Sequence, residues 1–188
     1  IEIYKNGKLL SKHGICAAIA SKIRPNTTAV VITACPNVCS LPLPLSEIGA
    51  LCRHRGILFI VDGAQAAGHF PIRIKQMQID ALAVPGHKGL LGPQGSGALI
   101  LGDGVFPEVL FEGGSGSASF DADMPDEIPE RYEAGTLSTP AIAGLTEGMR
   151  EVKKTGLDKI EKKADKTFFK SDFQKQIIFI LLHPALKL

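Results

Sequence analysis

The sequence lacks the long hydrophobic run that a membrane-spanning helix needs. Its longest unbroken apolar stretch is Ile177–Leu182, whereas a helix that crosses a bilayer takes about 20 predominantly apolar residues. The opening stretch Ile1–Leu10 alternates polar with apolar residues and contains no signal-peptide core. Because the first residue is isoleucine, we take the natural start to be missing, and we expect a soluble, cytoplasmic chain.

Cysteine is scarce, and its placement argues against a disulfide scaffold and against a metal site. The four cysteines all lie in the first third of the chain, at positions 16, 35, 39 and 52. Small secreted domains that rely on disulfides are much denser in cysteine than this chain of 188 residues. The spacing of these thiols and of His54 is poor for zinc, so we expect no bound metal.

Neither sign of charge is in clear excess. The chain has 21 Lys and Arg against 19 Asp and Glu, for a formal net charge of +2. This balance supplies no broad attraction to nucleic acid or to an anionic membrane. Eight of the fifteen lysines fall within Lys153–Lys175, but acidic residues are interspersed with them, which favours an exposed helix face. We therefore expect neither nucleic acid nor a membrane as a partner.

The glycine-rich fingerprints of nucleotide-binding folds are absent as well. Gly92, Gly95 and Gly97 do not have GxGxxG spacing, and no GxxxxGK[ST] sequence occurs. The sequence therefore gives no support to a dinucleotide-binding Rossmann fold or to a P-loop.

What the chain does contain is the pattern of an α/β domain. Its 188 residues, 45% of them apolar, are enough for one domain with a hydrophobic core. Short β-branched runs alternate with helix-like patterns, which is typical of a mostly parallel sheet covered by helices. Ser46 is the expected N-cap of one helix, and Gly56 is its expected stop. We expect strands at 29–33, 57–61, 81–84 and 97–101, helices at 45–55 and 140–154, and a surface excursion at 112–133.

Three polar residues, Asn37, Asp62 and Lys88, follow three of the expected strands. Parallel strands place them at one carboxyl edge of the sheet, where open α/β sheets bind ligands. A partly desolvated lysine can form a Schiff base with a carbonyl, and a nearby carboxylate can hold a pyridine nitrogen protonated. These are the two requirements of a pyridoxal phosphate site. A surface lysine and a helix-capping aspartate remain the alternative.

Three motifs resemble the cysteine desulfurase branch of the class V aminotransferases, which are fold-type I pyridoxal phosphate enzymes. The motifs are VDGAQA at 61–66, DALAVPGHKGLLGP at 80–93 and RYEAGTLSTP at 131–140, in family order. The resemblance runs from about Ile1 to Ile160 and implies part of a three-layer αβα large domain with a mostly parallel sheet. We expect residues 1–150 to form this cofactor-binding domain, without its N-terminal part. Residues 151–188 would form a helical, lysine-rich tail or the start of a truncated or divergent small domain.

The resemblance also implies a role for each residue at the sheet edge. Lys88 would bind the cofactor as a Schiff base and move protons at the substrate α-carbon. Asp62 would pair with the protonated pyridine nitrogen. Gln65 and Asn37 would contact the phenolic oxygen of the ring, and His87, the second expected catalytic residue, would contact the cofactor phosphate.

A sixth residue, Thr136, matches a family threonine that reaches the phosphate of the neighbouring subunit, which would make the enzyme a homodimer. Simpler structural roles stay open for four of the six residues. They are a turn residue for Asn37, a polar group at a helix start for Gln65, a structural histidine for His87 and a turn hydroxyl for Thr136.

The chain departs from the family pattern in three places. Pro85 stands where the family usually has a Ser or Thr that contacts the phosphate. The family's phosphate loop and ring-stacking residue would precede Ile1, and its substrate-binding arginine and persulfide-forming cysteine would follow the region of resemblance. The stretch Lys166–Leu188 does not continue the resemblance, and we hypothesise a divergent or out-of-frame tail. Other reading frames of the downstream DNA without any family-like continuation would refute this hypothesis.

The function implied is a cysteine desulfurase that converts L-cysteine to L-alanine and passes the sulfur on as a persulfide, with a sulfur-acceptor protein as a further partner. A class V aminotransferase or a selenocysteine lyase is the alternative within enzymes. The alternative that is not an active enzyme is a catalytically inactive fragment of such an enzyme.

Overall fold

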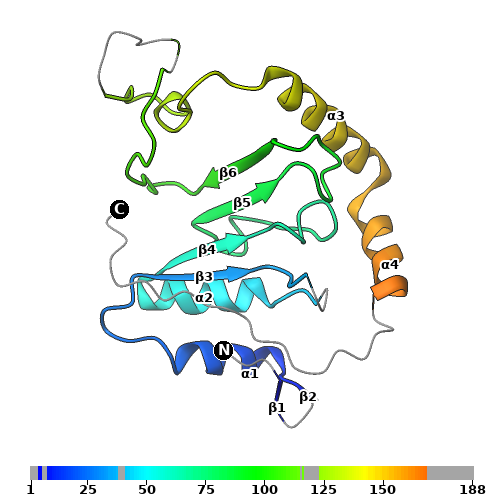
Figure 1. The fold of residues 1–188 in the computed structure, drawn as a ribbon. Coiled ribbons are helices and arrows are strands. Elements are labelled where there is room, and N and C mark those ends of the chain that lie inside the picture. Colours follow the sequence, from blue (N-terminus) through cyan, green and yellow to red (C-terminus); the bar gives the residue numbers. More distant parts are fainter. Residues whose placement is uncertain (1–3, 6–7, 38–40, 115, 117–122, 169–188) are drawn as a thin grey trace.

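A computed structural model describes residues 4–5, 8–37, 41–114, 116 and 123–168 (Figure 1). In chain order its elements are β1 (Tyr4–Lys5), β2 (Lys8–Leu9), α1 (Lys12–Ala20), β3 (Ala29–Thr33), α2 (Leu45–Arg55), β4 (Leu58–Asp62), β5 (Ala81–Pro85), β6 (Gly97–Leu101), the 3-10 helix η1 (Glu130–Tyr132), α3 (Thr139–Thr155) and α4 (Leu157–Phe168). β1 and β2 form a small antiparallel pair, and the other four strands form the main sheet.

The main sheet has the strand order β3-β4-β5-β6. β3, β4 and β5 are parallel, with Val31 opposite Ile60 and Ile60 opposite Ala81. β6 runs antiparallel to β5, with Ala83 opposite Leu99. The reversal follows from the short connection Gly86–Ser96, since a parallel pairing needs a crossover of a dozen or more residues. The mostly parallel sheet with flanking helices confirms the fold class expected from the sequence.

The hydrophobic core lies between the sheet and the helices α1 and α2. Phe59, Val30 and Val61 of the strands are fully buried, as are Ile19 of α1 and Ile48 of α2. Figure 1 shows α2 lying along β3, with α1 on its outer side. Burial of this apolar surface, at about 25 cal/mol per Å², is the main force that holds the two layers together.

Helix α2 occupies the predicted range, but it begins differently. The residue at the N-cap is Pro44, and no side chain caps the helix there, so the prediction of Ser46 as the cap is wrong. Proline at that point presets φ for helix entry, which places Ser46 inside the first turn. Gly56 ends the helix in the left-handed region at φ 63°, as predicted for a C-terminal glycine.

The expected strands are confirmed with small shifts. β4 and β5 each extend to one residue beyond the predicted end, to Asp62 and Pro85. The connection from β4 to β5 consists of turns and contains no regular helix. The predicted helix at 140–154 is α3.

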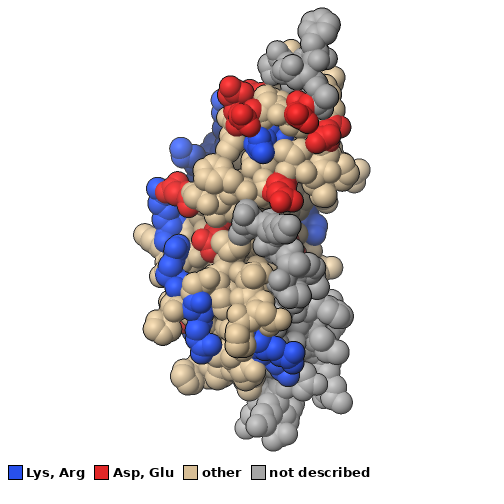
Figure 2. Space-filling model, turned by 90° about the vertical axis from the view of Figure 1, so that its left-hand side faces the viewer, with Lys and Arg blue, Asp and Glu red and all other residues tan. Residues whose placement is uncertain are grey.

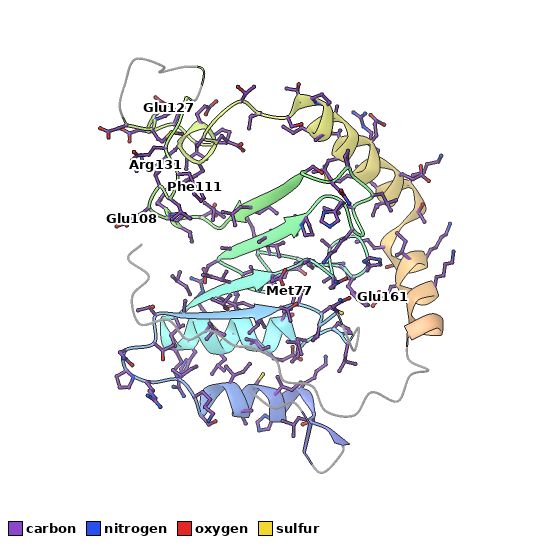
Figure 3. The ribbon with its side chains drawn as sticks, viewed as in Figure 1. Met77, Glu108, Phe111, Glu127, Arg131 and Glu161 are labelled. Carbon is purple, nitrogen blue, oxygen red and sulfur yellow. The ribbon has the colours of Figure 1, made fainter. Side chains whose placement is uncertain are left out.

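Beyond β6 the chain forms the long surface excursion that the sequence predicts. Its outgoing and returning parts lie side by side, because the Tyr132 hydroxyl donates to the Pro107 carbonyl over 2.9 Å and Gly135 N donates to the Gly114 carbonyl over 3.0 Å. Figure 3 shows Phe111, labelled near Arg131, in this excursion beyond β6. The middle of the excursion, 117–122, lies outside the described residues.

Charged side chains of both signs lie on the face drawn in Figure 2. On the face drawn in Figure 2, most acidic side chains lie toward one end and basic side chains lie along the remainder. In the part of the chain that the structure describes, no helix is both long enough and apolar enough to span a membrane.

Candidate functional site

The carboxyl ends of β3, β4 and β5 bring the residues expected at the site to one edge of the sheet. Asn37 follows β3, Asp62 is the last residue of β4, and His87 and Lys88 follow β5. Figure 1 shows the three strands ending on the same side, next to α3 and α4. Gln65 lies in the turn after β4, so it belongs to the same edge. Five of the six predicted site residues therefore share one edge.

Asp62 begins a turn, residues 62–69, that we call the aspartate turn. Its main chain is held by both neighbouring strands: Ala34 N donates to the Asp62 carbonyl, and Gly63 N donates to the Ala83 carbonyl, both over 2.8 Å. The side chain is solvent-exposed, and Oδ1 accepts a hydrogen bond from Ala64 N at 2.8 Å. The carboxylate is thus oriented by the turn while remaining accessible to a ligand.

Lys88 lies in the connection Gly86–Ser96, which we call the lysine loop. Gly86 N donates to the Ser96 carbonyl over 2.7 Å, Gly92 N donates to the Gly86 carbonyl over 2.8 Å, and Leu91 N donates to the Lys88 carbonyl over 2.9 Å. These bonds close the loop on itself around Gly86. Lys88 is half-buried, whereas His87 beside it is exposed.

The aspartate turn and the lysine loop meet through two glycines. Gly68 has φ +81°, and a Cβ on it would lie 2.0 Å from the Gly89 carbonyl oxygen. A Cβ on Gly89 would lie 2.3 Å from the Ala67 carbonyl oxygen and 2.5 Å from His69 Nδ1. Because real Cβ atoms do not approach so closely, only glycine permits this contact. The distance between the Asp62 turn and Lys88 is therefore fixed by backbone packing.

Helix α3 supports the lysine loop from another side. A Cβ on Gly148 would lie 2.4 Å from the Leu90 carbonyl oxygen, and a Cβ on Gly92 would lie 2.8 Å from the Leu145 side chain. Leu145 and Gly148 are one turn apart on the buried side of α3. The helix thus packs directly against the backbone of the loop that carries Lys88.

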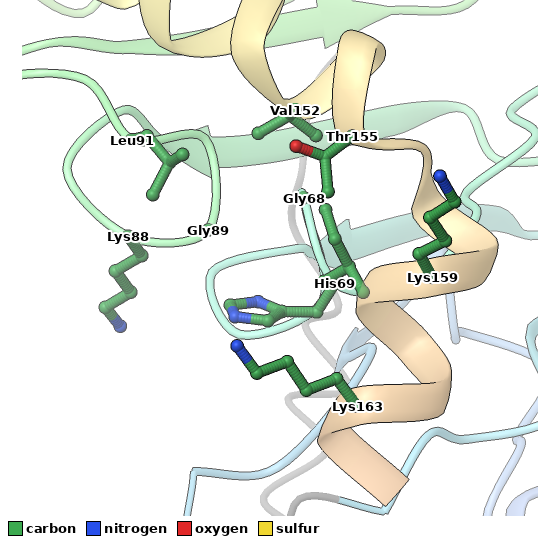
Figure 4. Close-up of a pocket in the computed structure, with 10 residues that line it drawn as sticks. Gly68, His69, Lys88, Gly89, Leu91, Val152, Thr155, Lys159 and Lys163 are labelled. Carbon is green, nitrogen blue, oxygen red and sulfur yellow. The ribbon is translucent and has the colours of Figure 1, made fainter.

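A pocket of about 570 Å³ lies where these segments meet (Figure 4). Its lining residues come from the aspartate turn, the lysine loop and the α3–α4 junction: Gly68, His69, Lys88, Gly89, Leu91, Val152, Thr155, Lys159, Ile160 and Lys163. Among the described side chains, His69 Nδ1 is the buried polar atom for which the structure shows no hydrogen-bond partner. In Figure 4 Lys88 extends to one side of its loop, and His69 and Lys163 lie on the other side.

Thr136 is not brought to this edge. It lies between η1 and α3, in the segment that reaches α3 from the β6 side of the sheet (Figure 1). Thr136 is exposed, and the preceding Gly135 has φ +92°. The expectation that Thr136 serves a second subunit stays a prediction.

The described cysteines are not arranged for metal binding. In the ranges that the structure describes, no group of three or more His, Cys, Asp or Glu side chains could hold an ion. Burial, with a smaller contribution from Glu47, raises the pKa of the Cys16 thiol. Burial also raises the pKa of Cys52 to about 12. Cys39 lies outside the described residues.

Sequence reasoning missed His69 and the glycines that support the lysine loop. Gly89 lies within the motif at 80–93 that carries Lys88, and Gly68 lies two residues beyond the motif at 61–66 that carries Asp62, but a sequence does not reveal which glycines touch across two loops. Only the tertiary contact shows that they hold the loops together.

Comparison with known proteins agrees with this geometry. Residues 3–174 match the family model described as aminotransferase class-V. A probable cysteine desulfurase from Pyrococcus abyssi is 37% identical over 126 residues, which are 65% of this chain and 31% of that protein. A probable cysteine desulfurase from Methanothermobacter thermautotrophicus is 32% identical over 148 residues, covering 77% of this chain and 37% of that protein. The chain thus spans about a third of the length of these relatives.

Solved structures give the same result for the fold. The apo structure of a cysteine desulfurase from Thermococcus onnurineus superimposes with a TM-score of 0.70 at 28% identity, over 87% of this chain and 41% of that one. The sequence match and the shared fold agree with the family resemblance of the three motifs. The chain belongs to the class V aminotransferase family, with the α/β fold of the large domain of fold-type I pyridoxal phosphate enzymes.

Proposed function

We propose that this chain carries the cofactor-binding part of a pyridoxal phosphate-dependent cysteine desulfurase. The observation that supports the proposal most is the position of Asp62 and Lys88 at the ends of neighbouring parallel strands, on loops locked together by Gly68 and Gly89. The relatives named as probable cysteine desulfurases support the choice of substrate.

The residues at the edge fit pyridoxal phosphate by their chemistry. The cofactor has an aldehyde, a pyridine nitrogen, a phenolic oxygen and a phosphate, and the edge offers an amine, a carboxylate, an amide and an imidazole. Lys88 supplies the amine, Asp62 the carboxylate, Gln65 the amide and His87 the imidazole. Asp62 is exposed and Lys88 is only half-buried, so both are open to a ligand.

In this proposal the chain's own groups bind and orient the cofactor, and they move protons at the substrate. Pyridoxal phosphate, when bound, acts as an electron sink that stabilises negative charge at the substrate α-carbon. Asp62 would keep the pyridine nitrogen protonated, and Asn37 and Gln65 would hydrogen-bond the phenolic oxygen. Lys88 would hold the cofactor through its amine and move the proton at the substrate α-carbon, and His87 would contact the phosphate.

The overall reaction is L-cysteine plus a thiol giving L-alanine plus a persulfide. A thiolate must attack the sulfur of cysteine, and the thiols of Cys16 and Cys52 are unsuited to this because burial raises the pKa of each. We propose that the persulfide-forming thiolate comes from a segment beyond the region of resemblance, as in the family pattern, and that a sulfur-acceptor protein takes up the sulfur. We also propose a cytoplasmic homodimer in which Thr136 reaches the phosphate of the neighbouring subunit's cofactor.

The test is covalent capture of the cofactor. Pyridoxal phosphate is added to the purified chain, borohydride is used to fix the linkage, and mass spectrometry locates the modified residue. We expect modification at Lys88, its loss in Lys88→Arg, and no change in Lys75→Arg, a matched control at an exposed lysine. Modification spread over many lysines, unchanged in Lys88→Arg, would contradict the proposal.

A second assay separates desulfurase from aminotransferase activity. The chain is incubated with L-cysteine, pyridoxal phosphate and dithiothreitol as thiol acceptor, and the products are measured. Alanine and sulfide in equal amounts are expected for a desulfurase, whereas conversion of the cofactor to its amine form indicates aminotransfer. Cofactor capture without either product would identify a catalytically inactive chain.

A further inference from the structure

The edge of the sheet opposite the lysine loop carries a second pocket. Its volume is about 270 Å³, and it lies where the chain enters β3 and β4. Figure 1 shows these two strands beginning on the side away from α3 and α4. A strand rises about 3.3 Å per residue, so the five residues of β3 separate this pocket from the Lys88 edge by about 15 Å. Six residues line it: Ile23, Arg24, Pro25, Thr27, Arg55 and Ile57.

One side of this pocket is a turn that two hydrogen bonds hold in shape. Thr27 N donates to the Arg24 carbonyl, and Arg24 N donates to Thr27 Oγ1, both over 2.9 Å. Pro25 follows Arg24 in the turn, at the position where proline presets φ. Because the Thr27 hydroxyl accepts from the main chain, its own proton is left to donate to a ligand. The turn therefore places a guanidinium and a hydroxyl donor beside the same space.

The other side of the pocket lies where α2 ends. Arg55 is the last residue of α2, and Ile57 follows the stop at Gly56. Leu58 N donates to the Thr28 carbonyl over 3.0 Å, which joins the start of β4 to the turn. The C-terminus of a helix carries about half a negative charge, whereas each arginine carries a full positive charge. The two arginines therefore leave the pocket with a net positive charge despite the helix end.

No acidic side chain of the described residues compensates the two arginines of the pocket. The lining contains no Asp or Glu, and neither arginine forms an ion pair within the ranges that the structure describes. Two acidic residues lie at the same edge, but each pairs with another base. Asp80 lies 3.7 Å from Arg53, and Asp103 lies 3.8 Å from Lys75. Two guanidinium groups without carboxylate partners match the oxygens of a doubly charged phosphate.

We propose that this pocket binds a phosphate group, either free or carried by a small organic molecule. Arg24 and Arg55 contact the phosphate oxygens, and the Thr27 hydroxyl donates to one of them. Ile23 and Pro25 offer apolar surface to a short organic body. Pockets for drug-sized ligands take about 300–1,000 Å³, so a volume of about 270 Å³ suits a smaller ligand. The site lies apart from the cofactor chemistry and does not use the lysine loop.

The experiment is calorimetric titration of the full chain with inorganic phosphate, glycerol 2-phosphate and acetate, at pH 8 and constant ionic strength, without pyridoxal phosphate. We expect saturable binding of both phosphate compounds and at least tenfold weaker binding of acetate, which carries a single charge. Tighter binding of the ester assigns the site to small phosphate esters, and equal or tighter binding of inorganic phosphate assigns it to the free anion. Equal binding of acetate and phosphate, or no saturable binding of phosphate, would overturn the proposal.

Matched substitutions locate the site. Arg24→Gln and Arg55→Gln each weaken phosphate binding about fivefold to tenfold, the scale of one charge-assisted hydrogen bond at an exposed position. Arg73→Gln removes the same charge from an exposed arginine outside the pocket, so it leaves binding nearly unchanged. Because Arg24 and Arg55 are exposed, thermal unfolding without ligand is expected to stay the same in their variants. Equal weakening by all three substitutions would show a general charge effect and overturn the proposal.

Lys88→Arg separates this site from the proposed cofactor site. Phosphate binding is expected to be unchanged in Lys88→Arg, and capture of pyridoxal phosphate at Lys88 is expected to be unchanged in Arg24→Gln and Arg55→Gln. Phosphate binding with no cofactor capture would support the phosphate site and contradict only the proposed function. Phosphate binding that is lost in Lys88→Arg would place the anion at the lysine loop and overturn the proposal.

Discussion

Cys52 of α2 is 1% exposed, and its surroundings determine the state of its thiol. Burial raises its pKa from the ordinary 9.0 to about 12, and the negative charges of Asp80 and then Cys16 add to the effect. The protonated thiol is a poor nucleophile. Cys52 therefore acts as a small core residue that packs between α2 and the sheet.

The raised pKa of Cys52 predicts how stability depends on pH. The unfolded chain releases this proton near pH 9, whereas the folded chain keeps it until about pH 12. Stability from this group is therefore full below pH 9 and is lost as the pH rises toward 12. Urea unfolding between pH 8 and pH 11 measures the slope, and Cys52→Ala is expected to flatten it. If stability falls with pH equally steeply in Cys52→Ala, the loss of stability at high pH comes from other groups.

At the scale of elements, the main feature is the contact between the aspartate turn and the lysine loop. Each follows a parallel strand, and β4 and β5 are neighbours in the sheet. Gly68 and Gly89 let the two backbones approach more closely than any side chain would allow. α3 packs against the same loop through Gly148, so three elements meet around Lys88.

A methyl group placed at Gly89 tests this arrangement. The Cβ of Gly89→Ala would collide with the Ala67 carbonyl oxygen and with His69, and overpacking of this kind costs about 1–3 kcal/mol. We expect a lower free energy of unfolding by urea and weaker capture of pyridoxal phosphate at Lys88. The control is Gly114→Ala, because nothing lies within 4 Å of a Cβ there. Equal stability of the two variants would rule out a tight contact.

At the scale of the whole molecule, apolar side chains extend over the surface beyond β5. Leu99 of β6 is 58% exposed, and Phe106, Leu110 and Phe111 of the following excursion are 62%, 83% and 74% exposed. β6 is the edge strand of the sheet as described. Several large apolar side chains exposed in one part of the chain favour association with another apolar surface.

The exposed apolar surface predicts self-association of this chain in solution. Replacing both Leu110 and Phe111 by Glu removes the two most exposed large side chains of this group. We expect the sedimentation coefficient at high protein concentration to fall toward that of a monomer. The double substitution Gln76→Glu and Gln94→Glu adds the same charge at exposed polar positions and is expected to change little. If the two double substitutions lower the sedimentation coefficient equally, the added charge alone explains the change and the apolar side chains do not.

Local patterns in the sequence were sufficient to predict most of the elements and the edge where site residues gather. The strand at 29–33 and the helix at 45–55 follow from apolar periodicity, and the stop at Gly56 follows from glycine's tolerance of positive φ. Asp62 and Lys88 fall at one edge because parallel strands end together. These predictions rest on neighbours along the chain, which a sequence displays directly.

The tertiary structure alone decided what depends on contacts between distant segments. The antiparallel direction of β6, the glycine contact between Gly68 and Gly89, and the pocket lined by His69 and Lys163 each join residues far apart in the sequence. The positive φ of Leu91 is likewise invisible in a pattern of residue types. Such features arise from close packing in three dimensions, so the sequence determined where the proposed catalytic groups lie along the chain, and the folded structure determined how they are held.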